Sequence, residues 1–412
     1  MVHSSVPPSS LYSTLSPLDF LFTCLGLVFL VLDIVLDVCA VVSFYNEKAY
    51  APLGFLLLFL VGSSLLVQAF SWLWYSYEDT KVEKCLSLSQ LRLLHVLQLG
   101  IYFRLCGFVS SNIVGFSVRS FCTKVHEGEG FAVYLSHDLS MLRLMETFSE
   151  SCPQLVLMLT IILQRNQLDP AIGSALAIAC SVTMYHRSLR SFLVDKKKQQ
   201  VTSSVVYFLW NLLLIAPRLT ALALFASVLP CFILTHFICS WIIFFFCAWR
   251  SQTNFMDSTF GEWLYRATVG LIWYFDWFNV VDGKTRYRTL LYHGYILADI
   301  SLLCGLYCWM KMSPEPPYLD TSLLNAIITA ASVVGVYILG LFSKMIYYKF
   351  FHPNLNKVQL DEVDFPLPSS DEGHSPVVMR SLIVPMDDVI TPEPNIKRCN
   401  KRMRKLAENF YS

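Results

Sequence analysis

Five ionisable residues lie inside long apolar segments of this chain, where lipid is the expected surrounding: Asp33, Asp37, Glu146, Glu150 and Arg218. An uncompensated charge near the centre of a bilayer costs at least ~2.5–3.5 kcal/mol. Buried ion pairs stabilise a fold less than apolar packing does, so this many charges favour a functional interior, water-lined or ion-paired, along which a polar group moves. The alternative is that the charges only pair with one another and fix the packing of the helices.

The first apolar segment carries an acidic stripe. Asp33 and Asp37 are four residues apart and therefore share one helix face, and Asp19 lies fourteen residues before Asp33, roughly on that face. A cation is needed to compensate such a row. Arg218 is the natural candidate, and we expect it to pair with Asp33 or Glu150.

A second charged face lies further along the chain. Arg143, Glu146 and Glu150 have i, i+3 and i+7 spacing, so they also project from one side of a helix. Pro153 follows them, and a proline within a lipid-embedded helix usually kinks it. Together the two faces predict a polar path formed by these residues: Asp19, Asp33, Asp37, Arg143, Glu146, Glu150 and Arg218.

The composition supplies the setting for these charges. The chain has 412 residues, of which 55% are hydrophobic and 15% charged, against about 25% charged in an ordinary soluble domain. Apolar runs of about 20 residues, the length that a bilayer crossing needs, recur along it. These features predict an all-α polytopic membrane protein. The net charge of +1 gives no reason to expect a nucleic-acid partner.

Ten apolar helical segments position the charges. They are 18–44, 51–76, 86–111, 131–164, 170–192, 203–229, 231–249, 258–281, 284–312 and 321–350. If all ten crossed, with the N-terminus inside, the inside loops would hold six Lys and Arg residues and the outside loops eight. If 86–111 and 258–281 dip in and return, the inside loops hold eleven and the outside loops three. The second arrangement obeys the positive-inside rule, so we expect eight transmembrane helices, two partially inserted helices and cytoplasmic termini.

The order of crossing and partial helices occurs twice, which favours two pseudo-symmetric repeats related by an axis along the membrane normal. Short matches support a duplication: Tyr102-Phe103 with Tyr274-Phe275, Ser71-Trp72 with Ser240-Trp241, and the segment from Asp138 to Leu142 with that from Asp299 to Leu303. We therefore divide the chain into a cytoplasmic N-terminus (1–17), an N-terminal repeat (18–200), a C-terminal repeat (201–350) and a cytoplasmic regulatory tail (351–412).

The tail contains the tetrapeptide that executioner caspases cut best. It reads Asp361, Glu362, Val363, Asp364, and the residue after the cut would be Phe365. Caspases prefer a small residue at that last position, so we expect slower cleavage than at an ideal site. The surrounding segment is acidic and rich in proline and serine, which is the accessible context that a protease requires.

The last residues of the tail form a short amphipathic pattern. A basic cluster precedes an apolar stripe with i, i+3, i+4 and i+7 spacing, made of Met403, Leu406, Ala407 and Phe410. We expect this helix to be autoinhibitory, with its apolar face docked in a cytoplasmic cavity between the repeats. A cut after Asp364 would release it.

No pattern typical of an enzyme or a metal site occurs in the sequence. There is no H-E-x-x-H among the nine histidines, no acidic cluster with EF-hand spacing, and no complete P-loop. We therefore expect no metal, no cofactor and no ATP-driven or enzymatic chemistry.

Four segments resemble the XK-related family of membrane proteins: Phe70–Trp74, Asp138–Leu155, Val205–Arg218 and Glu262–Val280. The resemblance covers essentially the whole chain. It implies eight crossings and two partly inserted helices in two repeats. It also implies energy-independent scrambling of phospholipids in the plasma membrane, activated by caspase cleavage, which exposes phosphatidylserine on apoptotic cells for engulfment. Members of this type pair with a single-span immunoglobulin-like chaperone, basigin or neuroplastin.

Two rival functions use the same buried charges. One is a transporter or channel for a small polar solute, which would leave the caspase site unexplained. The other is a non-transporting accessory subunit, whose charges would hold a partner helix.

Overall fold

Every regular element in the described part of the chain is a helix. The structure is a computed structural model that describes residues 34–77, 88–102, 104, 138–165, 182–183, 201–256, 258–280, 286–312 and 323–351. Within these ranges, five helices are long and apolar enough to cross a membrane, and the prediction of an all-α membrane fold is confirmed to that extent. The count of eight crossings, the two repeats and the side of the termini remain predictions.

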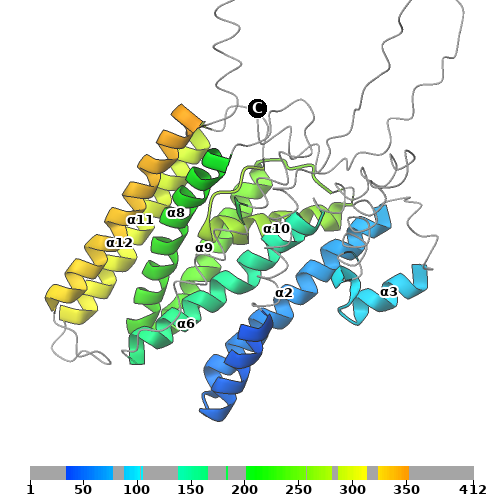
Figure 1. The fold of residues 1–412 in the computed structure, drawn as a ribbon, viewed down its shortest axis with the longest axis horizontal. Coiled ribbons are helices and arrows are strands. Elements are labelled where there is room, and N and C mark those ends of the chain that lie inside the picture. The colour runs from blue at the N-terminus through cyan, green and yellow to red at the C-terminus, as the bar shows by residue number, and fades with distance from the viewer. Residues whose placement is uncertain are drawn as a thin grey trace, which may run out of the picture.

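Three long helices form a bundle at one end of the molecule (Figure 1). They are α8 (Val201–Val228), α11 (Arg286–Met312) and α12 (Leu323–Ile346), and each packs on the other two. The backbones of α8 and α12 approach closely at Gly340, where a Cβ atom would lie 2.9 Å from the carbonyl oxygen of Leu213. Small residues allow such contacts between membrane helices.

Two helices of unequal length form the next pair. α9 (Pro230–Arg250) exposes large apolar side chains, among them Phe232, Phe246 and Trp249, as a lipid-facing helix should. α10 (Thr259–Phe275) packs beside it and begins at Ser258, whose Oγ accepts a hydrogen bond from Gly261 N at 3.0 Å. α10 has 17 residues, which at 1.5 Å each is too short for ~30 Å of hydrocarbon.

The other end of the molecule contains α2 (Tyr50–Tyr77) and the short helix α3 (Leu88–Val96) packed against it (Figure 1). α3 breaks after Val96, and Gln98 has a positive φ of 64°. Side chains of α2 bind this break. Ser64 donates to Gln98 Oε1 at 2.6 Å, and Gln68 Nε2 donates to the Gln98 carbonyl at 2.8 Å.

The helix with the second charged face is irregular where the charges lie. Residues 138–146 are α-helical, Thr147–Ser151 form a π-helical turn, and α6 (Cys152–Arg165) continues beyond it. Pro153 lies in the first turn of α6, directly after the π-helical turn. Such π-turns are rare and frequently lie at functional sites.

Candidate functional site

Three acidic residues of the predicted path, Asp37, Glu146 and Glu150, lie together at the π-helical turn. Gln154 of α6 donates a hydrogen bond from Nε2 to Asp37 Oδ1 at 2.6 Å, and Asp37 lies on helix Ile34–Asn46. The Glu150 carboxylate lies beside Asp37, and the charge of Glu146 acts on Asp37 as well. The two predicted faces are therefore brought together, and Gln154 joins them as a neutral donor.

Exposure decreases from one end of this cluster to the other. Arg143 Nη1 lies 2.6 Å from Glu146 Oε2, and these side chains are 30% and 26% exposed. Asp37 and Glu150 are each 8% exposed. The cluster is thus open at Arg143 and Glu146, and nearly closed one turn deeper.

Arg218 belongs to a different cluster. It lies on α8 and has no exposed surface, and its Nη1 lies 2.5 Å from Asp299 Oδ2 of α11. Its Nε donates to the carbonyl oxygen of Tyr274 at 3.1 Å, and its guanidinium carbon lies 5.1 Å from the centroid of the Tyr274 ring. The Nη2 atom has no hydrogen-bond partner within the described ranges.

His236 of α9 completes this second cluster. Its Nε2 lies 3.1 Å from Asp299 Oδ1, and its Nδ1 lies 2.9 Å from the hydroxyl of Tyr274. Because a carboxylate only accepts, His236 donates to Asp299 through Nε2, while its Nδ1 forms a hydrogen bond with the Tyr274 hydroxyl. One buried aspartate therefore neutralises the arginine and joins α8, α9 and α11.

The carboxylate that pairs with Arg218 among the described residues is Asp299, so the predicted pair with Glu150 is wrong. The alternative partner, Asp33, lies outside the described residues. The physical reason is register: α8 packs against both α6 and α11, and at the level of Arg218 the neighbouring carboxylate is Asp299 of α11. A signal for Asp299 was present, because it is an acidic residue in an apolar segment and matches Asp138 in the internal comparison. His236 and Gln154 gave no comparable signal, whereas Tyr274 appears in the internal comparison as the match of Tyr102.

Several predicted residues lie outside the described part of the chain. They are Asp19, Asp33, the caspase site from Asp361 to Phe365, and the tail-helix residues Met403, Leu406, Ala407 and Phe410.

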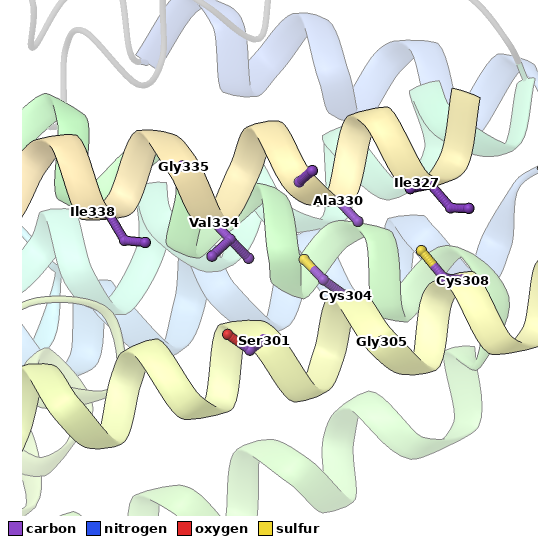
Figure 2. A pocket seen from close by; sticks show the side chains of 10 residues that line it. Ser301, Cys304, Gly305, Cys308, Ile327, Ala330, Val334, Gly335 and Ile338 are labelled. Atoms are coloured by element: carbon purple, nitrogen blue, oxygen red, sulfur yellow. The ribbon is translucent and has the colours of Figure 1, made fainter. Parts of the chain in front are cut away.

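A cavity of about 500 Å³ opens between α11 and α12, and none of the residues that line it belongs to either charged cluster (Figure 2). Small and apolar residues line it, among them Ser301, Cys304, Gly305, Ala330, Val334 and Gly335. This chemistry suits a hydrocarbon chain and would leave a charged headgroup without partners.

Comparison with known proteins supplies the family. A family model described as XK-related protein matches residues 21–353. Three relatives are called XK-related protein 8. The chain is 43% identical to that of Tetraodon nigroviridis over 96% of each chain, and 40% identical to that of Gasterosteus aculeatus over 97% of this chain and 98% of the relative. It is 33% identical to that of Pan troglodytes over 95% of this chain and 94% of the relative.

Proposed function

We propose that this chain, which belongs to the XK-related family, is an energy-independent phospholipid scramblase of the plasma membrane. The family expected from the sequence is confirmed, and the chain is a multi-pass membrane protein. The observation that carries the proposal is the similarity to XK-related protein 8 over nearly the full length, together with the caspase tetrapeptide ending at Asp364.

A scramblase must offer a polar route for the headgroup while the acyl chains stay in lipid. The cluster of Asp37, Arg143, Glu146 and Glu150 supports such a route, because it is exposed at Arg143 and Glu146 and its inner end is lined by the carboxylates of Asp37 and Glu150. Carboxylates suit the amine of serine and ethanolamine headgroups. Asp19 and Asp33 would extend this acidic lining, as their spacing to Asp37 predicts.

Arg218 would bind the phosphate of a passing lipid. Its unpartnered Nη2 is a spare donor, and a guanidinium matches phosphate geometry. Because Arg218 has no exposed surface here, the full-length chain would represent a closed state in which this part of the path must still open.

The tail would keep the path closed. In this proposal the helix containing Met403, Leu406, Ala407 and Phe410 docks on the cytoplasmic side, and an executioner caspase cuts after Asp364. Residues 365–412 then bind only as a separate peptide, which removes the millimolar effective concentration that a tether supplies. A single-span chaperone, basigin or neuroplastin, would be the membrane partner, as the family resemblance implies.

The test uses purified chain in liposomes with fluorescent lipid in both leaflets. Caspase treatment should start lipid movement in the unaltered chain and have no effect on Asp364→Ala, whereas a chain ending at Asp364 should scramble without protease. The untreated chain with its tail intact and the untreated Asp364→Ala variant are the controls, and neither should move lipid. A truncated chain that moves solute but no lipid would instead support the transporter alternative.

A further inference from the structure

A second buried ion pair lies outside the proposed path. Arg104 and Asp138 are each 1% exposed, and Arg104 Nη1 binds a carboxylate oxygen of Asp138. Among the described residues Arg104 bonds to Asp138 and Ser71, and neither is a residue of the proposed path. A buried ion pair is weak evidence for stability, so its location calls for another explanation.

Arg104 uses all three of its guanidinium nitrogens. Besides Asp138, its Nε donates to Ser71 Oγ at 3.1 Å, and its Nη2 donates to the Ser71 carbonyl oxygen at 3.2 Å. Its guanidinium carbon lies 3.8 Å from the centroid of the Tyr75 ring. Ser71 and Tyr75 both belong to α2. A lysine could not reproduce this planar, three-nitrogen contact.

Ser71 extends the contact to α3. The Nδ1 atom of His95 lies 2.8 Å from the carbonyl oxygen of Leu91, which can only accept, so this nitrogen carries the proton. In the neutral ring Nε2 then accepts from the Ser71 hydroxyl at 3.0 Å. Ser71 of α2 therefore bonds to both His95 and Arg104, and Arg104 in turn connects α2 to Asp138.

Asp138 lies on the same helix that carries the second charged face. Glu146 lies eight residues further on, which is ~12 Å along an α-helix. A second contact joins this helix to α2: Ser149 Oγ donates to Ser63 Oγ at 2.9 Å. The distance between these two residues therefore measures the register of the helix against α2. Whatever fixes Asp138 against α2 therefore also fixes where Glu146 and Glu150 lie.

We propose that Arg104 and Asp138 are positioning residues of the lipid path, which set the register of the helix that carries Glu146 and Glu150 against α2. This inference rests on the proposed scramblase function for its effect on activity, but not for the register itself. The cluster around Arg218 offers a parallel. Asp299, the residue that matches Asp138 in the internal comparison, pairs with the buried Arg218 of another helix.

The register can be measured without any scrambling assay. Cysteines at both serine positions, Ser63→Cys with Ser149→Cys, should form a disulfide on mild oxidation, because the two hydroxyl oxygens are only 2.9 Å apart. The chain with Ser63→Cys alone gives the background from native cysteines. Into the double-cysteine chain we would introduce Arg104→Lys, Asp138→Asn, or the neutral pair Arg104→Gln with Asp138→Asn.

Asp138→Asn alone leaves Arg104 as an unpaired buried charge, and that chain could fail to fold. The neutral pair removes both charges, so it still tests the register in that case. Arg266→Lys is the matched control. Arg266 donates through Nε and Nη2 to Thr253 and lies 3.5 Å from Glu262. Thr253 precedes α10, and Glu262 and Arg266 belong to α10. Arg266→Lys therefore loses similar bonds at a site away from the path helix.

We expect Arg104→Lys and the neutral pair to slow the cross-link roughly tenfold, the size of effect that coupled contacting residues give, with monodisperse protein on size exclusion. Arg266→Lys should not slow it. In chains with the serines restored and the tail cut, the same variants should slow lipid movement by a similar factor. Unchanged cross-linking in the folded variants, or unchanged lipid movement despite slower cross-linking, would overturn the proposal.

The scramblase function and the helix register are tested by separate measurements. If the unaltered, cleaved chain moves no lipid, the scramblase proposal is wrong. The cross-linking result then still decides whether Arg104 and Asp138 set the register.

Discussion

A fully buried arginine in this structure is neutralised by one carboxylate from a neighbouring helix. Arg218 has no exposed surface, and Asp299 lies 2.5 Å from it while also accepting from His236 at 3.1 Å. Removing one partner of such a pair leaves an uncompensated charge, whose cost exceeds the net value of the pair itself.

Asp299→Asn should therefore destabilise the protein strongly, by about 3–5 kcal/mol, since Arg218 would keep its charge without a carboxylate. The measurement is the midpoint of thermal unfolding of the detergent-solubilised chain. Ser301→Ala, on the same helix and with a hydroxyl that donates to the Leu297 carbonyl, is the control and should change the free energy of unfolding by less than about 0.5 kcal/mol. A similar midpoint for both variants would contradict this account of the cluster.

Glu146 presents the opposite case. Its pair with Arg143 is about a quarter to a third exposed, and exposed pairs contribute at most about 1 kcal/mol. Glu146→Gln should leave the unfolding midpoint nearly unchanged while lowering lipid exposure by the cleaved chain. Lipid exposure at the level of the unaltered chain would remove Glu146 from the path.

At the scale of elements, close backbone approach decides how the three-helix bundle packs. A Cβ at Gly340 of α12 would lie 2.8 Å from a side-chain carbon of Leu214 and 2.9 Å from the backbone of Leu213. At Gly335 of the same helix a Cβ would meet nothing within 4 Å. Gly335 lines the cavity between α11 and α12, whereas Gly340 contacts α8.

Gly340→Ala should force α8 and α12 apart and cost about 1–3 kcal/mol, as overpacking does. Gly335→Ala should be neutral or slightly stabilising, because alanine favours the helix over glycine. Thermal unfolding of both variants under identical detergent conditions compares them directly. Equal midpoints would mean that α8 and α12 do not pack as described.

At the scale of the whole molecule, the distribution of loop charges predicts which side each turn faces. Lys48 and Gln252 are both exposed, both have positive φ angles, and each lies in a turn between two helices. The positive-inside count places Lys48 outside the cell and the turn that contains Gln252 inside.

A membrane-impermeant maleimide should label Lys48→Cys on intact cells. It should label Gln252→Cys only after permeabilisation, because in the predicted arrangement α10 enters the membrane from the cytoplasmic side and returns to it. The unaltered chain gives the background from its native cysteines. Labelling of Gln252→Cys on intact cells would exclude the arrangement with two partially inserted helices.

Much of the helical content could be predicted because it depends on local properties. Long apolar runs such as Tyr50–Tyr77 and Pro230–Arg250 have only one way to satisfy their backbone groups in lipid. The shared face of Arg143, Glu146 and Glu150 follows from helical periodicity alone, and the spacing of the caspase tetrapeptide needs no fold at all.

The pairing of charges could not be predicted in the same way. The sequence by itself determined that Asp37, Glu150 and Arg218 lie in apolar helices and therefore need compensation. Only the tertiary structure decided that Arg218 pairs with Asp299 and that Asp37 meets Gln154. The reason is that an ion pair depends on which helices are neighbours and at what register, and those are set by packing between residues far apart in the chain.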